Sequence, residues 1–146
     1  MADPEPLKQW PSEDIPDACR LLLRVHVDLV PDLELGPNVF REHGGSMSTD
    51  WGKYSTPHET RARTGRASKN GVVSLLAETV RTIDGLGIKH EPDEERQNRA
   101  HAGVYGIDAP SGSGDLTDKK RRTRIRFELF KICAGWLIDP RERVRT

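Results

Sequence analysis

Residues 18–30 read ACRLLLRVHVDLV, and this stretch decides the character of the fold. Leucine and valine dominate it, which is typical of a β-strand, and Pro31 ends it. Side chains two residues apart in a strand share a face. Arg24 and His26 therefore fall on one face, and Leu23 and Val25 fall on the other. We predict a half-buried strand with one polar face and one apolar face.

Further along the chain, short apolar runs alternate with turn residues. GVVSLL over residues 71–76 predicts a buried strand, and residues 77–83 predict one or two helical turns that stop at Asp84 and Gly85. Residues 88–90 and 100–107 predict two more strands. Thr56-Pro57-His58-Glu59 has the pattern of a helix start, with a threonine cap and a glutamate three residues later.

The clearest helical pattern runs from Lys119 to Ile138, and Asp139-Pro140 stops it. One face of this helix collects its apolar residues: Ile125, Leu129, Ile132, Cys133, Trp136 and Leu137. The fold class that follows is α+β, with a small, largely antiparallel sheet and one long C-terminal amphipathic helix packed on it.

The chain has 146 residues, close to the commonest size of a single domain. We expect a loose, acidic, proline-rich arm over residues 1–17, one globular domain over 18–140 and a basic tail over 141–146. No stretch approaches the roughly 20 apolar residues that span a bilayer, and the acidic N-terminus does not resemble a signal peptide. We therefore expect a cytoplasmic protein without membrane contact, and free thiols at Cys19 and Cys133.

Histidine and arginine mark the candidate site. His26 and His101 are the candidate catalytic residues, because imidazole can transfer protons near neutral pH. The candidate ligand-binding residues supply guanidinium forks, hydrogen-bonding groups and rings that could stack on a base: Arg24, Ser48, Asp50, Trp51, Tyr54, His90, Asn98 and Arg99. Such a set suits a nucleotide-like or phosphate-bearing ligand. Each group also has an alternative without a ligand. For Arg24 and His26 it is a solvated strand face, and for His90 and Asn98–His101 it is a capped turn. For residues 46–57 it is a folded loop that is pinned by its aromatic residues.

No metal and no cofactor are predicted, because none of the 5 histidines stands at a metal-ligand spacing.

The net charge is zero, but the two parts of the chain differ. Residues 1–118 hold 13 basic and 20 acidic side chains, whereas residues 119–146 hold 10 basic and 3 acidic ones. Four cations crowd the start of the predicted helix, where the helix dipole disfavours positive charge. We predict that they contact a polyanion such as RNA, with a solvated helix end as the alternative: Lys119, Lys120, Arg121 and Arg122.

The order of these motifs resembles a group of small bacterial proteins of unknown function. The residues that carry the resemblance are Leu23–His26, Phe40-Arg41, Ser46–Pro57, Gly71–Val73, His90–Pro92, Asn98–His101 and Trp136–Ile138. The resemblance implies a bacterial protein but no particular activity. An early strand with Arg and His before a serine-containing loop is more remotely similar to NAD-consuming or ADP-ribosyl-transferring folds, whose catalytic glutamate near the C-terminal strand has no clear counterpart here.

Two function classes remain open from the sequence. One is a protein with a polar pocket for a phosphate-bearing ligand, whether an enzyme or not. The other is a non-catalytic protein–protein interaction module, such as an operon partner or an inhibitor. Convergence of His26, His90 and His101 with residues 46–57 in one pocket would favour an enzyme, and scatter over the surface would favour the interaction module.

Overall fold

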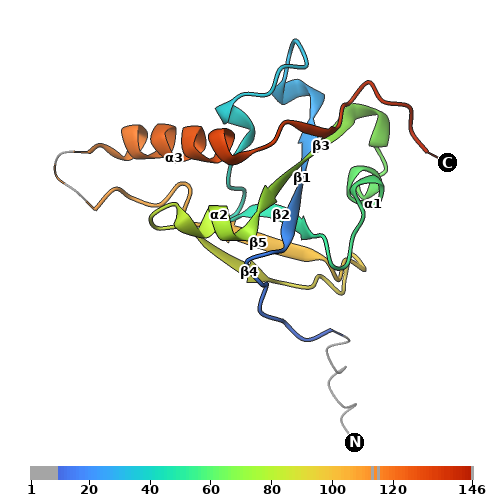
Figure 1. The fold of residues 1–146 in the computed structure, drawn as a ribbon, viewed down its shortest axis with the longest axis horizontal. Coiled ribbons are helices and arrows are strands. Elements are labelled where there is room, and N and C mark those ends of the chain that lie inside the picture. Colours follow the sequence, from blue (N-terminus) through green and yellow to red (C-terminus); the bar gives the residue numbers. More distant parts are fainter. Residues whose placement is uncertain (1–9, 113, 115, 146) are drawn as a thin grey trace, which may run out of the picture.

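The structure is a computed structural model that describes residues 10–112, 114 and 116–145. Its centre is a six-stranded antiparallel sheet in the order β4-β5-β2-β1-β3-β6 (Figure 1). The strands are β1 (Arg20–His26), β2 (Met47–Trp51), β3 (Asn70–Leu76), β4 (Gly87–His90), β5 (His101–Tyr105) and β6 (Trp136–Ile138). The α-helices are α1 (Pro57–Ala62), α2 (Ala77–Thr82) and α3 (Asp118–Ile132). The α+β class is confirmed.

The strand register gives the sheet two faces of different chemistry. Leu21 pairs with Trp51 and belongs to the hydrophobic core, whereas the next pair, Leu22 and Asp50, points to the opposite side. We call the first side the core face. The second side, which we call the polar face, carries Arg24, His26, Ser48, Asp50 and His101. The predicted alternation therefore holds over Arg20–His26, whereas Val27–Leu29 form a short 3-10 turn, so the strand ends before Pro31.

Helices cover both faces of the sheet but leave part of the polar face open. α2 and α3 lie on one side of the sheet and α1 on the other (Figure 1). Ile125 and Leu129 of α3 are buried with Leu21, Leu23 and the rest of the core. α1 begins as predicted, because the Thr56 side chain accepts a hydrogen bond from the Glu59 backbone N–H at 3.2 Å. The predicted packing of the C-terminal helix on the sheet is confirmed.

That helix is shorter than the sequence pattern indicates. It ends at Ile132, and Gly135 adopts a positive φ of 94° that interrupts the helical path. Trp136 and Leu137 then lie in β6, beside β3, so their place on a helix face was a wrong prediction. The Trp136 indole donates to the Leu33 carbonyl at 3.0 Å and lies so close to Gly71 that a Cβ there would be 2.4 Å from its ring.

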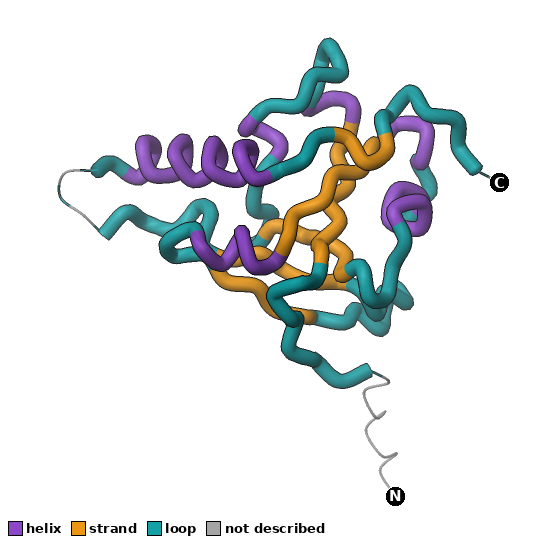
Figure 2. The backbone as a smooth tube through the Cα atoms, in the orientation of Figure 1, coloured by secondary structure: helices purple, strands orange, loops and turns teal. Residues whose placement is uncertain are grey.

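β2 was not predicted, because residues 46–57 were interpreted as a loop. Met47, Thr49 and Trp51 are buried on the core face, while Ser48 is exposed on the polar face. This alternation with a period of two is typical of a strand, but residues 47–51 form one because they pair with β1 and β5. Apart from two short helical turns, the chain that leads from β1 into β2 runs as loop (Figure 2).

Both ends of the described chain lie against the domain. Residues 1–9 of the predicted loose arm lie outside the described residues. In residues 10–17, Ile15 is buried, and Arg81 donates at 2.6 Å both to the Ile15 carbonyl and to Asp17 Oδ1. At the C-terminal end, the guanidinium of Arg61 donates to three backbone carbonyls of the terminal segment: Pro140, Glu142 and Arg143.

In the described ranges, every helix is too short or too polar to span a membrane.

Candidate functional site

The polar face contains a hollow that we call the basic pocket. Its volume is about 460 Å³, and its charged or ionisable lining residues are Arg24, His26, Arg41, His43 and Arg66. The two histidines and three arginines are joined by Ser48, Thr64 and Asn70, and no carboxylate is among the lining residues. Such a lining favours an anionic ligand.

Arg24 is a cation of the basic pocket that is held by the protein on one side. Its side chain is half-buried, and its Nη1 donates to the Thr60 carbonyl at 3.3 Å. Burial lowers the pKa of Arg24; the charge of Asp50 opposes this shift and the charge of Arg63 adds to it. Among the described residues, Arg24 forms no ion pair. It is therefore a partly desolvated cation without a carboxylate partner in contact.

His26 has one ring nitrogen committed to the protein. The backbone N–H of Asp28 donates to His26 Nδ1 at 3.1 Å. A nitrogen that accepts a hydrogen bond carries no proton, so the neutral ring holds its proton on Nε2. Asp28 Oδ2 lies 3.4 Å from the same Nδ1, so a carboxylate stands on that side of the ring. His26 can then donate from Nε2 to an anion in the basic pocket.

A smaller hollow adjoins the basic pocket, and we call it the Asp50 pocket. It has a volume of about 170 Å³ and shares Arg24, Ser48 and Thr64 with its neighbour. Asp50 itself is 4% exposed. Its Oδ2 accepts from Arg63 Nε and Thr60 Oγ1, each at 2.8 Å, and its Oδ1 accepts from Asn98 Nδ2 at 2.9 Å. This carboxylate is fully used in joining β2 to α1 and to Asn98.

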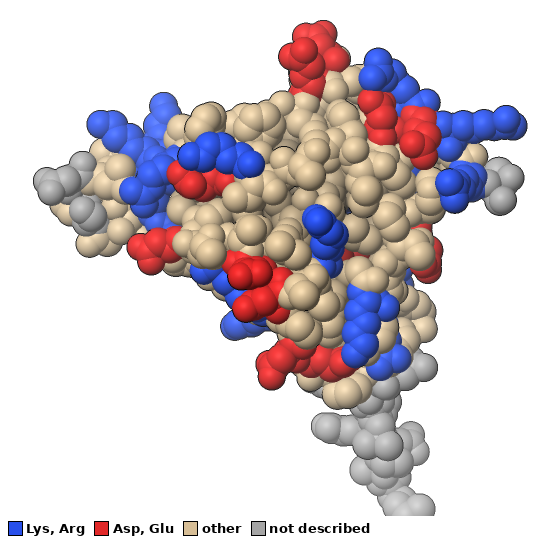
Figure 3. All heavy atoms as spheres, viewed as in Figure 1, with Lys and Arg blue, Asp and Glu red and all other residues tan. Residues whose placement is uncertain are grey.

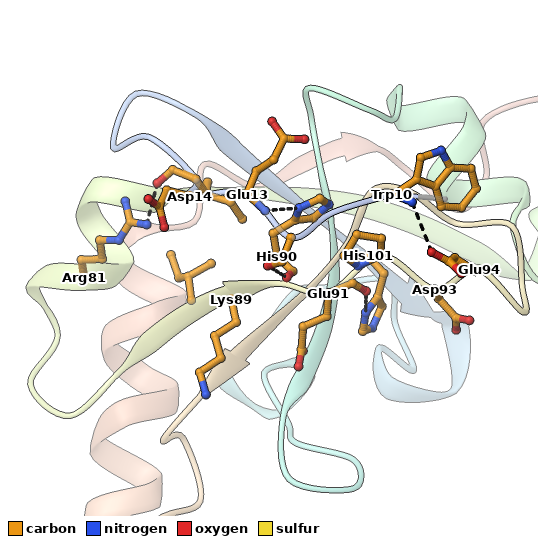
Figure 4. Close-up of a pocket in the computed structure, with 14 residues that line it drawn as sticks. Trp10, Glu13, Asp14, Arg81, Lys89, His90, Glu91, Asp93, Glu94 and His101 are labelled. Atoms are coloured by element: carbon orange, nitrogen blue, oxygen red, sulfur yellow. Dashed lines mark hydrogen bonds between the residues drawn. The ribbon is translucent and has the colours of Figure 1, made fainter. Parts of the chain in front are cut away.

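His101 and Ser48 lie on neighbouring strands at the edge of the Asp50 pocket. His101 Nε2 is 3.3 Å from Ser48 Oγ, and His101 Nδ1 is 2.9 Å from the Glu91 carbonyl oxygen. Figure 4 shows the second of these contacts and the His101 ring turned away from the ring of His90. A serine, an imidazole and a backbone acceptor are thus arranged in a row.

Trp51 lies in the core and offers no exposed ring face, whereas the sequence suggested that it could stack on a base. It is 1% exposed because its position in β2 places it on the core face, one residue beyond Asp50. Its ring meets the rings of Tyr54 and His90 edge-on, with centroids 5.3 and 5.1 Å away. The basic pocket contains no aromatic lining residue besides its histidines.

His90, Tyr54 and Arg99 hold the arm and do not line either pocket of the polar face. His90 is 2% exposed, its Nδ1 accepts from the Glu13 backbone N–H at 3.0 Å, and its Nε2 is 2.7 Å from the Arg99 carbonyl (Figure 4). Arg99 stacks on Tyr54 at 4.2 Å from the ring centroid. The hydrogen bond from Tyr54 lowers the pKa of Glu13 most, and the hydrogen bond from Lys53 lowers it further.

The hollow beside this arm is the largest, at about 760 Å³, but its chemistry does not suit an anion. Its lining includes five carboxylates: Glu13, Asp14, Glu91, Asp93 and Glu94. Only one lysine, one arginine and two histidines accompany them. The basic pocket is therefore the better candidate for a phosphate group.

The basic run at the start of α3 is only partly available to a partner. Arg121 is 7% exposed, and its Nη1 donates to the carbonyls of Ile107 and Ala109 at 3.1 and 3.0 Å. Arg121 is thus not exposed for the predicted contact with a polyanion, since the helix turns this residue toward the segment that follows β5. Lys119 and Lys120 are exposed and Arg122 is half-buried. Lys and Arg side chains gather where α3 begins, on the left in Figure 3.

The structure brings together one part of the predicted site and separates the rest. Arg24, Ser48, Asp50, Asn98 and His101 meet at the Asp50 pocket. His26 lines only the neighbouring basic pocket, and His90 faces the arm, so the three histidines do not share one pocket. By the criterion given above, this separation favours the interaction module over an enzyme that uses all three histidines. Several polar lining residues outside the strands were not predicted from the sequence, among them Arg41, His43, Arg63, Thr64 and Arg66. No local signal marks them, because their segments meet only in the folded chain.

Within the described part of the chain, no three His, Cys, Asp or Glu side chains are grouped so that they could hold a metal ion. No protein-family model matches this chain, and neither a curated protein nor a solved structure is similar to it at a significant level.

Proposed function

We propose that this protein binds a phosphate-bearing small molecule in the basic pocket. The observation that carries the proposal is Arg24, a half-buried guanidinium without an ion pair among the described residues. Arg41 and Arg66 line the same pocket. A phosphate would restore the solvation that Arg24 loses on burial and would be held in a fork of parallel hydrogen bonds.

The phosphate, and not a nucleobase, is the part of the ligand that these residues support. Trp51 is buried and Tyr54 is occupied by Arg99, so neither offers a free ring for stacking. His26 and Ser48 add hydrogen-bonding groups to the pocket. The proposed ligand class is therefore a phosphate ester or an inorganic polyphosphate.

Replacing Arg24 with glutamine should weaken the binding of pyrophosphate about tenfold to a hundredfold. Hydrogen bonds to charged groups contribute about 1.5–3 kcal/mol each, and 1.4 kcal/mol is a factor of ten in affinity. Isothermal titration calorimetry with pyrophosphate at low salt measures the change directly.

Arg145→Gln is the matched control, because it removes the same charge from an exposed position outside the pocket. It should leave the dissociation constant nearly unchanged. Equal losses in the two variants would mean that only net charge matters, and the absence of heat with the unmodified protein would reject the proposed function.

A second candidate function is polyanion binding at the exposed side of α3. Phe127 is 51% exposed beside Pro37, in a hollow of about 570 Å³ whose rim carries Lys119, Lys120 and Arg124. Exposed cations around a half-exposed aromatic ring suit an acidic segment of another protein or a nucleic acid.

Changing Lys119, Lys120 and Arg124 together to glutamine should abolish binding to single-stranded RNA or to polyglutamate in a gel-shift titration at low salt. Binding by the unmodified protein should fall steeply between about 50 and 200 mM salt, because several counterions are released. Arg121 is left unchanged in this variant, since its side chain is buried. A variant with Lys69, Arg143 and Arg145 changed to glutamine is the charge-matched control, and equal loss in both would contradict a site on α3.

A further inference from the structure

We propose that Ser48 is a nucleophile activated by His101 and that it takes a phosphoryl group from a phosphate monoester bound at Arg24. The inference rests on the proposed function, because the basic pocket supplies the anion. It adds an activity to that binding site. The juxtaposition that carries it is the row formed by Ser48 Oγ, the His101 ring and the Glu91 carbonyl.

The hydrogen bonds determine where the protons of this row lie. A carbonyl oxygen can only accept, so His101 Nδ1, at 2.9 Å from the Glu91 carbonyl, carries the proton and donates it. In the neutral ring, Nε2 then holds a lone pair. The hydroxyl of Ser48, at 3.3 Å, is the donor to that lone pair. This is the tautomer that a general base needs in order to take the serine proton.

The backbone also fixes the base in place. The Glu91 N–H donates to the His101 carbonyl at 2.8 Å, in addition to the side-chain contact from His101 to the Glu91 carbonyl. The imidazole is therefore oriented by one hydrogen bond to the Glu91 carbonyl, and the backbone hydrogen bond keeps Glu91 beside His101. A nucleophile, a base and a group that orients the base are the three parts of an activated serine.

Ser48 is placed where the two pockets of the polar face meet. It is exposed, and it lines both the basic pocket and the Asp50 pocket, as Arg24 does. Leu22 pairs with Asp50 in two antiparallel strands, so Arg24, two residues after Leu22, and Ser48, two residues before Asp50, lie on the same face of adjacent strands. A phosphoryl group held by Arg24 would thus lie beside the serine oxygen.

The reaction then balances in two steps. Ser48 Oγ attacks phosphorus, and its proton passes to His101 Nε2. The bond from phosphorus to the leaving alcohol breaks on the side opposite Ser48, so the alcohol oxygen takes a proton from solvent and His101 releases its proton to solvent. Water, deprotonated by His101, attacks the phosphoserine, inorganic phosphate leaves, and Ser48 recovers its proton. Arg24 faces the negative charge of the phosphoryl oxygens in both steps.

A neutral fluorophosphonate is the sharpest probe of the serine, because the phosphorus electrophile bonds to an activated hydroxyl and releases fluoride. Incubation of the whole protein followed by peptide mass spectrometry should place the label on Ser48. His101→Gln should slow labelling about a hundredfold or more, in the range that general base catalysis contributes. Ser48→Ala should abolish it, and Ser68→Ala, at another exposed serine, should not change it.

Circular dichroism reports whether each variant folds. If the His101→Gln variant fails to fold, the labelled position in the unmodified protein still decides the question. Absence of label, a label on other serines, or equal rates with and without His101 would overturn the proposal. Since the probe is neutral, these results do not depend on the arginines, and pyrophosphate binding could still be present in the calorimetric experiment.

The same variants extend the test to turnover. The unmodified protein should hydrolyse p-nitrophenyl phosphate with a transient phosphoserine at Ser48. Ser48→Ala should lose hydrolysis completely, while its affinity for pyrophosphate falls by no more than about tenfold, the contribution of one hydrogen bond. Hydrolysis that persists in Ser48→Ala would reject the role of this serine as a nucleophile.

Discussion

Replacement of Arg61 by methionine is expected to lower the free energy of unfolding by about 3–5 kcal/mol, a loss that only a few mechanisms produce. Arg61 is 1% exposed. Its guanidinium donates to five backbone carbonyls, from Ala67, Asn70, Pro140, Glu142 and Arg143, at 2.6 to 3.5 Å. Methionine fills much of the space but donates nothing, and each buried acceptor without a donor costs about 1–3 kcal/mol.

Urea unfolding followed by circular dichroism measures this effect through the midpoint. Arg61→Lys should recover part of the loss, because an ammonium keeps the charge but cannot form the planar fork. Arg145→Met, at an exposed position of the same terminal segment, should leave the midpoint almost unchanged. Faster amide exchange over residues 140–145 in the Arg61 variant would locate the damage. A midpoint that matches the unmodified protein would show that the terminal segment is held by other contacts.

Trp51→Ala should be the most destabilising change in the core of the sheet, at about 3–5 kcal/mol. Trp51 is 1% exposed and packs within the main hydrophobic cluster, with Tyr54 and His90 at its ring edges. Truncation to a methyl group leaves a cavity that the paired strands β1 and β5 cannot close. The docking of the arm should weaken as well, because Trp51 packs against His90, and His90 accepts a hydrogen bond from the Glu13 N–H.

Trp51→Phe separates the effect of volume from that of the polar indole nitrogen. The Trp51 Nε1 has no hydrogen-bond partner among the described residues, so phenylalanine removes an unsatisfied donor together with some volume. Its cost should be clearly smaller than that of alanine. Leu137→Ala is the control, since Leu137 is 48% exposed, and its midpoint should change little. Equal costs for Trp51→Ala and Leu137→Ala in urea unfolding would contradict the central position of Trp51.

Short-range signals were sufficient for much of the fold. The run of residues 18–30 predicted β1 and the separation of Arg24 and His26 from the apolar side chains, and the capping pattern at Thr56 predicted the start of α1. These features depend on residues within one turn or one strand, where sterics and local hydrogen bonds act directly. The side-chain types alone were also sufficient to name five candidate site residues that meet in the structure: Arg24, Ser48, Asp50, Asn98 and His101.

Only the tertiary structure decided which of these polar residues work together. Strand pairing turned Trp51 into the core and Ser48 toward His101, although they lie three residues apart in one segment that was interpreted as a loop. α3 ends at Ile132 because Cys133 is already extended, and Trp136 then packs against Gly71, which lies 65 residues earlier in the chain. Arg61 and Arg121 are buried because distant carbonyls surround them, and nothing in their own neighbourhoods distinguishes them from exposed arginines. Hydrophobic periodicity and capping are properties of adjacent residues, whereas a pocket, a buried cation and an oriented imidazole arise where separate segments meet.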